Sequence, residues 1–301
     1  MAYQTMRKKL IKVLGYLKLT RWLPDACYLR IRYWGEFGEH LDLENPKTFS
    51  EKLQWIKLFD RRPEYTTLVD KVAVKDWVAA RIGAEYVIPT LGIWDRFDDI
   101  DFGALPDRFV LKCTHDSGGL CICKDKITFD RETAKTKITR SLNRNYFPGG
   151  REWPYQAVPR RILAETYLEA ENGVLADYKF HCFNGEPKVI LVCQDRYETS
   201  GLTEDFFTAD WTHLEVGRPD HPHAKTVPAR PKNLDKMLEI ARMLSIGIPF
   251  VRVDLYDLGT QVYFGEMTFF PASGLKRFEP QSFDDEMGSW LLLPAKKEAK
   301  A

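Results

Sequence analysis

Two apolar segments near the C-terminal end of the chain carry charged residues of both signs. Arg252 and Asp254 are two residues apart in one segment, and Glu266 and Thr268 are two apart in the next. Because residues two apart in a strand share a face, an antiparallel hairpin of these segments would place Asp254 opposite or diagonal to Glu266. Adjacent carboxylates repel unless a proton or a divalent cation lies between them, and Mg²⁺ prefers oxygen ligands. The spacing predicts a metal site beside Arg252, with a solvent-facing Arg–Asp ion pair as the alternative.

A second charged group lies at the end of another apolar run. The segment Phe109-Val-Leu-Lys112 leads into the polar loop His115-Asp-Ser-Gly-Gly119, and an apolar run returns at 120–124. A lysine at a strand end supplies a point charge for phosphates, and the N–H groups of a glycine-bearing loop can bind phosphate oxygens. The same pattern, taken alone, also describes a tight hairpin whose lysine faces water.

Other kinds of site lack their sequence signatures. The chain contains no G-x-x-x-x-G-K-[ST], no G-x-G-x-x-G and no G-x-S-x-G segment, so three common nucleotide-binding and hydrolase loops are absent. It has no C-x-x-C pair, and His221-Pro-His223 lies in a proline-rich stretch without nearby thiols, which disfavours a zinc site. Asp99-Ile-Asp101 has the D-x-D spelling of some glycosyltransferases but is more typical of an acidic turn.

These charged residues need an α+β scaffold to bring them together. Apolar and β-branched runs predict strands at 86–89, 107–113, 120–124, 161–167, 177–183, 188–192, 250–256 and 261–267. Helices are expected at 50–58, with Ser50 as N-cap, and at 70–83, 130–145 and 234–245. Asn184-Gly185 is a hairpin signal, and the proline-rich stretch 198–232 is expected to be a long loop. Strands joined mostly by hairpins, with helices between them, favour an α+β fold.

Composition excludes several classes of protein. The 301 residues carry a net charge of only +1, so no basic field for nucleic acid exists. The apolar runs are too short to span a bilayer, and no signal peptide is apparent. Six cysteines without an export signal are typical of reduced thiols, so the expected location is the cytoplasm.

The N-terminal 35 residues have a charge balance of their own. They contain eight Lys or Arg residues against Asp25 alone, and Leu10, Leu14 and Leu17 recur at helical spacing. This pattern predicts a basic amphipathic helix. Such a helix either makes a peripheral contact with the inner face of a membrane or docks on the body of the protein.

Taken in order along the chain, these features resemble the TupA-like ATP-grasp family, which is associated with cell-envelope polysaccharide and teichuronopeptide synthesis. The resemblance covers about residues 40–280 and is carried by Asn45-Pro-Lys-Thr-Phe-Ser-Glu-Lys-Leu-Gln-Trp55, Gly150-Arg-Glu-Trp153, Asp177-Tyr-Lys-Phe-His-Cys-Phe-Asn-Gly185, Phe250-Val-Arg-Val-Asp-Leu-Tyr256 and Phe264-Gly-Glu-Met-Thr-Phe269. It implies an ATP-grasp fold in which two α+β lobes hold ATP. The expected organisation is a basic helical segment at 1–44, a catalytic domain at 45–290 with lobes at roughly 65–168 and 169–280, and a tail at 291–301.

The resemblance also implies roles for individual residues. Nucleotide contacts would come from Lys71, Lys112, the loop Ser117, Gly118 and Gly119, the hinge residues Glu165, Thr166 and Leu168, and from Asp177 and Lys179. Catalysis would depend on Arg252, Lys112 and Lys179, and Mg²⁺ would bind Asp254, Glu266 and Thr268. Thr268 stands where many members of the superfamily have Asn, and a hydroxyl is a weaker Mg²⁺ ligand, so the number of metal ions stays open.

The activity implied by the resemblance is ADP-forming carboxylate–amine ligation through an acyl phosphate, with ATP and Mg²⁺ as cofactors. The expected partners are a carboxylate and an amine, with an amino acid or similar amine attached to a uronic acid of a surface polysaccharide. The alternative is an ATP-grasp kinase that phosphorylates a glycan or small-molecule hydroxyl. Intact Lys112, Asp254 and Glu266 argue against an inactive nucleotide-binding scaffold.

Overall fold

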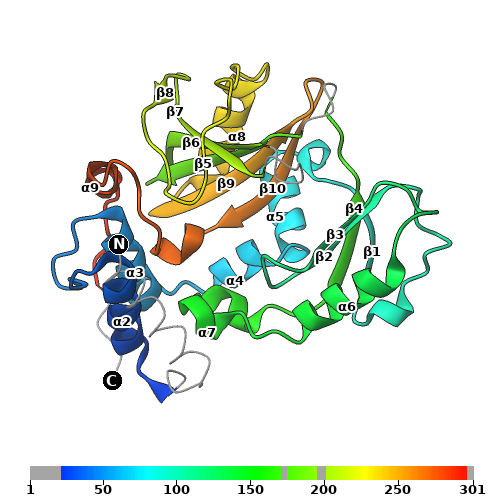
Figure 1. Cartoon of the computed structure of the whole chain (residues 1–301), viewed down its shortest axis with the longest axis horizontal. Helices are drawn as coiled ribbons and strands as arrows, with labels where there is room; N and C mark the ends of the chain where they lie inside the picture. The colour runs from blue at the N-terminus through cyan, green and yellow to red at the C-terminus, as the bar shows by residue number, and fades with distance from the viewer. Residues whose placement is uncertain (1–21, 171–174, 195–200, 297–301) are drawn as a thin grey trace.

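The computed structural model describes residues 22–170, 175–194 and 201–296. Two antiparallel sheets lie on either side of the helices α4 (Glu64–Val69) and α5 (Ala73–Ile82) (Figure 1). The small sheet has the strand order β1-β4-β2-β3, and the large sheet has the order β10-β9-β5-β6-β7-β8. This arrangement confirms the predicted α+β fold with two lobes.

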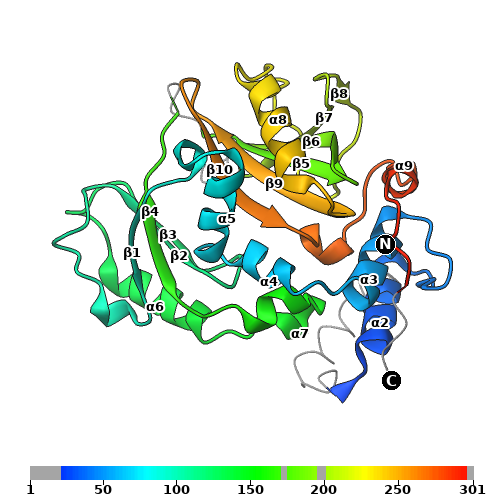
Figure 2. The ribbon, with the colours of Figure 1, turned by 180° about the vertical axis from the view of Figure 1, so that it is seen from behind.

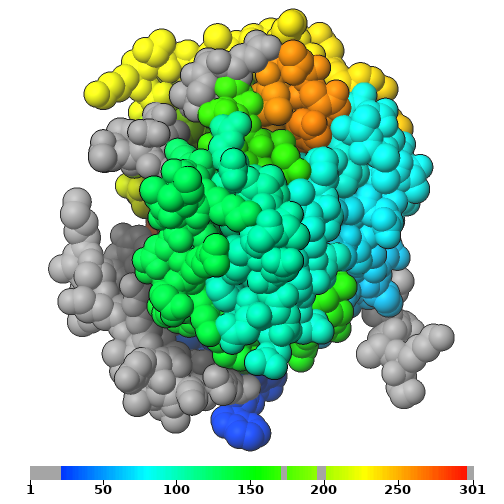
Figure 3. Space-filling model, turned by 90° about the vertical axis from the view of Figure 1, so that its right-hand side faces the viewer, coloured from blue at the N-terminus to red at the C-terminus, as the bar shows by residue number. Residues whose placement is uncertain are grey.

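The small sheet, with helix α6 (Arg131–Leu142), forms the small lobe. Its strands are β1 (Thr90–Trp94), β2 (Phe109–Cys113), β3 (Leu120–Cys123) and β4 (Ile162–Thr166). Phe109, Leu111 and Ile138 are fully buried between the sheet and α6, where they form a separate apolar core. In the view of Figure 3, the blue-green and green segments of the small lobe fill the centre of the surface. The orange β9–β10 segment lies above them.

The large sheet is covered on one face by α8 (Leu234–Ser245) (Figure 2). Its strands are β5 (Asp177–Phe183), β6 (Glu186–Gln194), β7 (Thr203–Thr208), β8 (His213–Leu214), β9 (Phe250–Asp257) and β10 (Val262–Thr268). The predicted β5–β6 hairpin is confirmed. Asn184 and Gly185 turn the chain with φ of 50° and 90°, left-handed values that suit a two-residue hairpin turn.

A group of helices packs at the far side of the large sheet from the small lobe (Figure 1). It comprises α2 (Asp25–Phe37), α3 (Phe49–Phe59) and α9 (Ser282–Trp290), while α7 (Phe147–Gly150) lies nearer the small lobe. The N-cap of helix α3 lies two residues earlier than predicted, because Thr48 rather than Ser50 caps the helix and forms a capping box with Glu51. Short 3-10 turns span Ala84–Tyr86, Phe97–Asp99, Trp153–Ala157 and Pro271–Gly274, so the D-x-D segment begins in a turn, as expected.

Two predictions about secondary structure are wrong. Residues 86–89 are not a strand, because only Val87 forms a bridge, to Phe264, and the strand begins at Thr90 after a proline that lacks an N–H. The stretch 198–232 is not only a loop, because β7 and β8 lie within it. Strand β7 was not predicted, because it carries the charged residues Glu204 and Asp205. Their burial depends on partners elsewhere in the chain.

The predicted amphipathic helix around Leu10, Leu14 and Leu17 lies outside the described residues, so membrane contact stays a prediction, as do the domain limits. Within the described part of the chain, no helix is both long and apolar enough to cross a bilayer. Helix α2 contributes the buried Tyr28 and Leu29 to the main core. A membrane-binding test should therefore remove residues 1–20 and leave α2 in place.

Asp284 in α9 gives the fold a specific pH dependence. Its buried carboxylate accepts hydrogen bonds from the N–H and hydroxyl of Ser50, and burial raises the pKa of Asp284 to about 6. Between about pH 4 and pH 6 the folded chain therefore keeps a proton that the unfolded chain has lost. The free energy of unfolding should fall as the pH rises through this window. A pKa shift of two units corresponds to about 3 kcal/mol.

The measurement is urea unfolding of the wild type and of Asp284→Asn between pH 4 and pH 8. The asparagine keeps an acceptor for Ser50 but cannot titrate. The wild type should lose stability relative to the variant as the pH rises from 4 to 6. Parallel profiles would contradict the prediction.

Candidate active site

The inner face of the large sheet, opposite α8, carries the charged residues of β5 and β9. Cys182 of β5 contacts the carbonyl of Ala241 in α8, so Lys179, an odd number of positions away, points to the other face. In the β9–β10 hairpin, Asp254 lies opposite Glu266 and Arg252 lies opposite Thr268, which confirms the predicted pairing. The register shifts at a bulge between Phe264 and Glu266, so the hairpin bends where these side chains meet.

Asp254 is the centre of a buried ionic network. Its carboxylate accepts two hydrogen bonds from Arg252, both of 2.7 Å, and lies 2.5 Å from the Nζ of Lys179. Lys179 also lies 2.5 Å from Asp177. Burial by itself would lower the pKa of Lys179, but Asp177 and Asp254 outweigh it, so its pKa is raised and the residue stays charged. The pKa of Arg252 is raised in the same way, chiefly by Asp254. This network fixes two cations on the inner face.

Glu266 is more exposed than Asp254, with a side chain 38% exposed against 2%. Its nearest cations are Arg252 at 3.4 Å and Lys71 at 4.0 Å, and the Thr268 hydroxyl lies 3.5 Å away. The oxygen donors of Glu266 and Thr268, with the remaining lone pair of Asp254 Oδ1, fit a hard divalent cation such as Mg²⁺. Most of the acceptor capacity of Asp254 is already used by Arg252 and Lys179, so Glu266 would be the principal ligand.

Glu165 forms a second charge network in the small lobe. Its carboxylate lies 2.6 Å from Lys112 and 2.6 Å from Lys75. Burial alone would raise the pKa of Glu165, but the two lysines outweigh it and lower the pKa. Burial opposes the charge of Lys112, yet Glu165, followed by Glu266 and Asp177 of the large sheet, raises its pKa. Lys112 therefore interacts electrostatically with carboxylates of both lobes.

Lys75 was not predicted as a site residue, although it stands only four positions after Lys71. Lys75 also donates to the carbonyl of Ile88 at 2.6 Å. Burial lowers the pKa of Lys75, and Glu165 offsets only part of that effect. Lys75 therefore anchors the Glu165 carboxylate from α5.

The loop 117–119 differs in part from its predicted role. Ser117 and Gly118 are exposed, and the Ser117 hydroxyl lies 3.2 Å from that of Tyr146. Gly119 is buried, and its N–H donates to Asp116 at 3.0 Å. A Cβ on Gly119 would lie 2.5 Å from Ser141 Oγ, so this glycine is required for packing. Of the three predicted phosphate contacts, only Ser117 and Gly118 are exposed.

The hinge after β4 needs a similar correction. The Thr166 N–H donates to the carbonyl of Pro89 at 3.1 Å, so this N–H is not available to an adenine edge. Leu168 lies two residues beyond the end of β4, where the chain has left the sheet. Its contact with an adenine stays a prediction.

Two further residues on the inner face were not found from the sequence. Arg218 pairs with Glu204 of β7 at 3.5 Å, with side chains only 10% and 5% exposed. His181 of β5 is fully buried opposite Arg252. Burial, and then the charges of Arg252 and Arg218, lower the pKa of His181 well below its usual value, so it is neutral near pH 7. Arg218 gave no sequence signal, because it lies in a proline-rich stretch.

Two α+β lobes with facing lysines, and a β-hairpin carrying Arg252, Asp254 and Glu266 between them, define an ATP-grasp protein. The family model described as "TupA-like ATPgrasp" matches residues 51–292, which is most of the chain. The chain therefore belongs to the TupA-like ATP-grasp family. No curated protein matches it.

Solved structures resemble the chain distantly. D-Alanine-D-alanine ligase from Helicobacter pylori is 11% identical, with 82% of this chain and 70% of that chain covered and a TM-score of 0.45. A RimK-domain ATP-grasp protein from Sphaerobacter thermophilus is 12% identical, with 78% and 71% covered and a TM-score of 0.42. N5-Carboxyaminoimidazole synthetase from Staphylococcus aureus, complexed with ADP, is 15% identical, with a TM-score of 0.37; 67% of this chain but only 44% of the synthetase is covered. Such distant likenesses carry no conclusion about activity.

Proposed function

We propose that the chain is an ATP-dependent carboxylate–amine ligase that releases ADP. The observation that carries this proposal is the gathering of Lys71, Lys112 and Arg252 around Glu266, between the two sheets. Phosphoryl transfer needs little from a protein beyond positioning and neutralisation of negative charge. Lys112 and Arg252, each fixed by a buried carboxylate, supply both.

The residues of the site divide this work. Lys71 and Lys112 would hold the phosphates of ATP from the small-lobe side, with Ser117 and Gly118 covering them. Glu266, Asp254 and Thr268 would hold Mg²⁺, which when bound neutralises charge on the phosphoryl oxygens. Arg252 would stabilise the charge of the transferring phosphoryl group, since its guanidinium is fixed by Asp254 and cannot turn away.

The proposed reaction has two steps. A carboxylate oxygen of the substrate attacks the γ-phosphorus, the bond to the bridging oxygen breaks, and ADP leaves. An amine nitrogen then attacks the acyl carbon, phosphate leaves with the bonding electron pair, and the amine loses a proton. Arg218, which pairs with Glu204 on the same face as Arg252, would hold the substrate carboxylate.

The proposed substrates are an amino acid or similar amine and a uronic acid of a surface polysaccharide. The support is the family to which the chain belongs, together with a site rich in cations that a sugar acid would complement. A kinase acting on a hydroxyl would use the same nucleotide site, so the products must separate the two reactions.

The test is hydroxylamine trapping. An acyl phosphate is electrophilic at carbon, so hydroxylamine should yield a hydroxamate when ATP, Mg²⁺ and the correct uronic acid are present, without any native amine. A panel of uronic acids would be screened for ADP release and hydroxamate, with products identified by mass. A stable phosphomonoester, with no hydroxamate from any carboxylate that stimulates ADP release, would overturn the ligase in favour of the kinase.

A further inference from the structure

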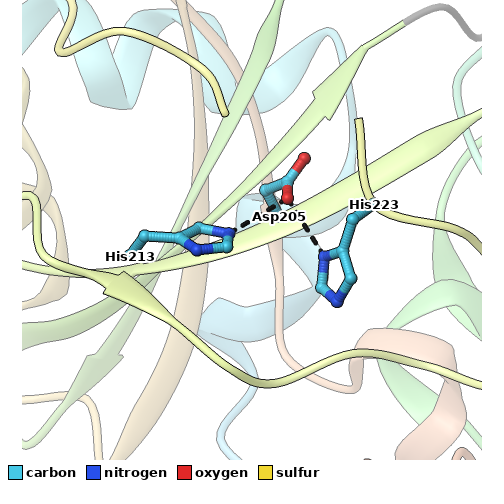
Figure 4. Close-up of side chains that lie close together, drawn as sticks. All are labelled: Asp205, His213 and His223. Carbon is cyan, nitrogen blue, oxygen red and sulfur yellow. Dashed lines mark hydrogen bonds and ion pairs between the residues drawn. The ribbon is translucent and has the colours of Figure 1, made fainter. Parts of the chain in front are cut away.

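A cluster of metal-ligating side chains lies on the large sheet, outside the proposed active site. Asp205 lies on β7, His213 on β8, and His223 on the segment 215–224 that follows β8. Figure 4 shows the two imidazole rings converging on the Asp205 carboxylate. His213 Nε2 lies 3.1 Å from Asp205 Oδ1, and His223 Nδ1 lies 3.0 Å from the same oxygen.

The geometry of this cluster suits a tetrahedral metal ion. Zinc binds imidazole nitrogen and carboxylate oxygen at about 2.0–2.1 Å, which separates neighbouring ligand atoms by about 3.3 Å. The three ligand atoms all lie within 4.8 Å of one another. Two imidazoles favour zinc over Mg²⁺, which prefers oxygen ligands. The donor set and its spacing therefore match zinc.

The surroundings of the cluster also favour a metal. Asp205 is buried, and its second oxygen accepts a hydrogen bond of 3.0 Å from the N–H of Ala224, which fixes the carboxylate. The side chains of His213 and His223 are 23% and 45% exposed, so an ion can enter and a water molecule can complete the coordination. Gly217 leaves room for the second ring, because a Cβ there would lie 3.1 Å from His223 Nε2.

We propose that Asp205, His213 and His223 bind one zinc ion that fastens the segment 215–224 to β7 and β8. Backbone hydrogen bonds already hold this segment at Glu204–Pro222, of 3.0 Å, and at Gly217–Glu279, of 2.9 Å in each direction. The zinc ion adds a further attachment through His223. Because Arg218 belongs to the segment, the ion also holds that guanidinium in place at the inner face of the large sheet.

The test is zinc binding by the full chain without an affinity tag, stripped of metal by a chelator and free of nucleotide and Mg²⁺. Calorimetric titration with zinc chloride and metal content after gel filtration should both give one zinc ion per chain. Loss of an outer-shell partner of a metal ligand costs about 10- to 100-fold in affinity. His213→Gln and His223→Gln each remove a ligand itself and should lose at least as much.

Two variants serve as matched controls. His221 lies in the same segment with a side chain 32% exposed, but it lies near Asp220, so His221→Gln should keep the wild-type affinity. Glu266→Gln should also keep it, which excludes binding at the proposed Mg²⁺ site. The proposal would be overturned if the wild-type protein bound no zinc. It would also be overturned if His213→Gln and His223→Gln bound zinc as tightly as the wild type does.

Cobalt(II) provides a second measurement that does not depend on the variants. Tetrahedral cobalt absorbs visible light strongly, whereas octahedral cobalt does so weakly. The cobalt-loaded wild type should show the strong band, and zinc should abolish it. If the three side chains form only a hydrogen-bonded triad, with both imidazoles donating to Asp205, no such band appears and the zinc site is rejected.

Discussion

Replacing Glu266 by Gln should lower the rate of ADP release by about a thousandfold while leaving the protein folded. The substitution keeps the size of the side chain and removes the negative charge that would hold Mg²⁺. Loss of that charge stabilisation is worth about 4 kcal/mol in a phosphoryl-transfer site. The side chain is 38% exposed, so the fold does not depend on it. Steady-state ADP release, with circular dichroism to confirm folding, is the measurement.

The control for this variant is Glu239→Gln on the outer face of α8. Glu239 is an exposed carboxylate that pairs with Lys236 at 2.6 Å, on the opposite face of the sheet from the proposed metal site. Its replacement should leave ADP release unchanged. Wild-type turnover by Glu266→Gln would remove Glu266 from the proposed metal site.

Arg252→Ala should lose both turnover and stability. The guanidinium forms a two-pronged pair with Asp254, and the two side chains are only 11% and 2% exposed. Removing one partner of a buried ion pair costs about 3–5 kcal/mol when the other charge is left alone, and Lys179, 2.5 Å from Asp254, should keep the loss below that range. The missing positive charge should also reduce hydroxamate and amide formation by about a hundredfold or more. Urea unfolding and single-turnover assays measure the two effects separately.

Arg252→Lys distinguishes charge from geometry at this position. A lysine keeps the positive charge near Asp254 and should recover part of the stability. It cannot donate to Asp254 and Thr268 at once in the planar geometry of arginine, so turnover should stay low. Arg242→Ala is the matched surface control, since Arg242 pairs with Glu186 on the exposed side of α8. Full turnover by Arg252→Ala would contradict the proposed role.

Local patterns in the sequence determined the strands of the site and their pairing. Strands β9 and β10 are joined by a short turn, so alternation within each strand was enough to place Asp254 opposite or diagonal to Glu266, and the bulge between Phe264 and Glu266 decided that they lie opposite. The β5–β6 hairpin followed from Asn184-Gly185 for the same reason. The position of Lys112 followed from its place at the end of β2, next to the loop that leads into β3.

Only the tertiary structure decided which charges are compensated and which residues are buried. The apolar run before Pro89 looked like a strand, but its one bridge is to β10, a distant element. Gly119 was expected to bind phosphate through its N–H, which Asp116 instead occupies. The N–H of Thr166, a predicted adenine contact, instead donates to the carbonyl of Pro89 in the chain preceding β1.

The sequence by itself therefore determined the ATP-grasp hairpin, the order of the charged residues and the α+β class, because these depend on neighbours close in the chain. Strand β7 was hidden by its own charges, since Glu204 and Asp205 can be buried only where Arg218, His213 and His223 compensate them. Lys75 and Glu165 are likewise brought together from α5 and β4. A buried charge costs free energy unless an oppositely charged or hydrogen-bonding partner compensates it. When that partner is distant in the sequence, only the folded chain shows which residue it is.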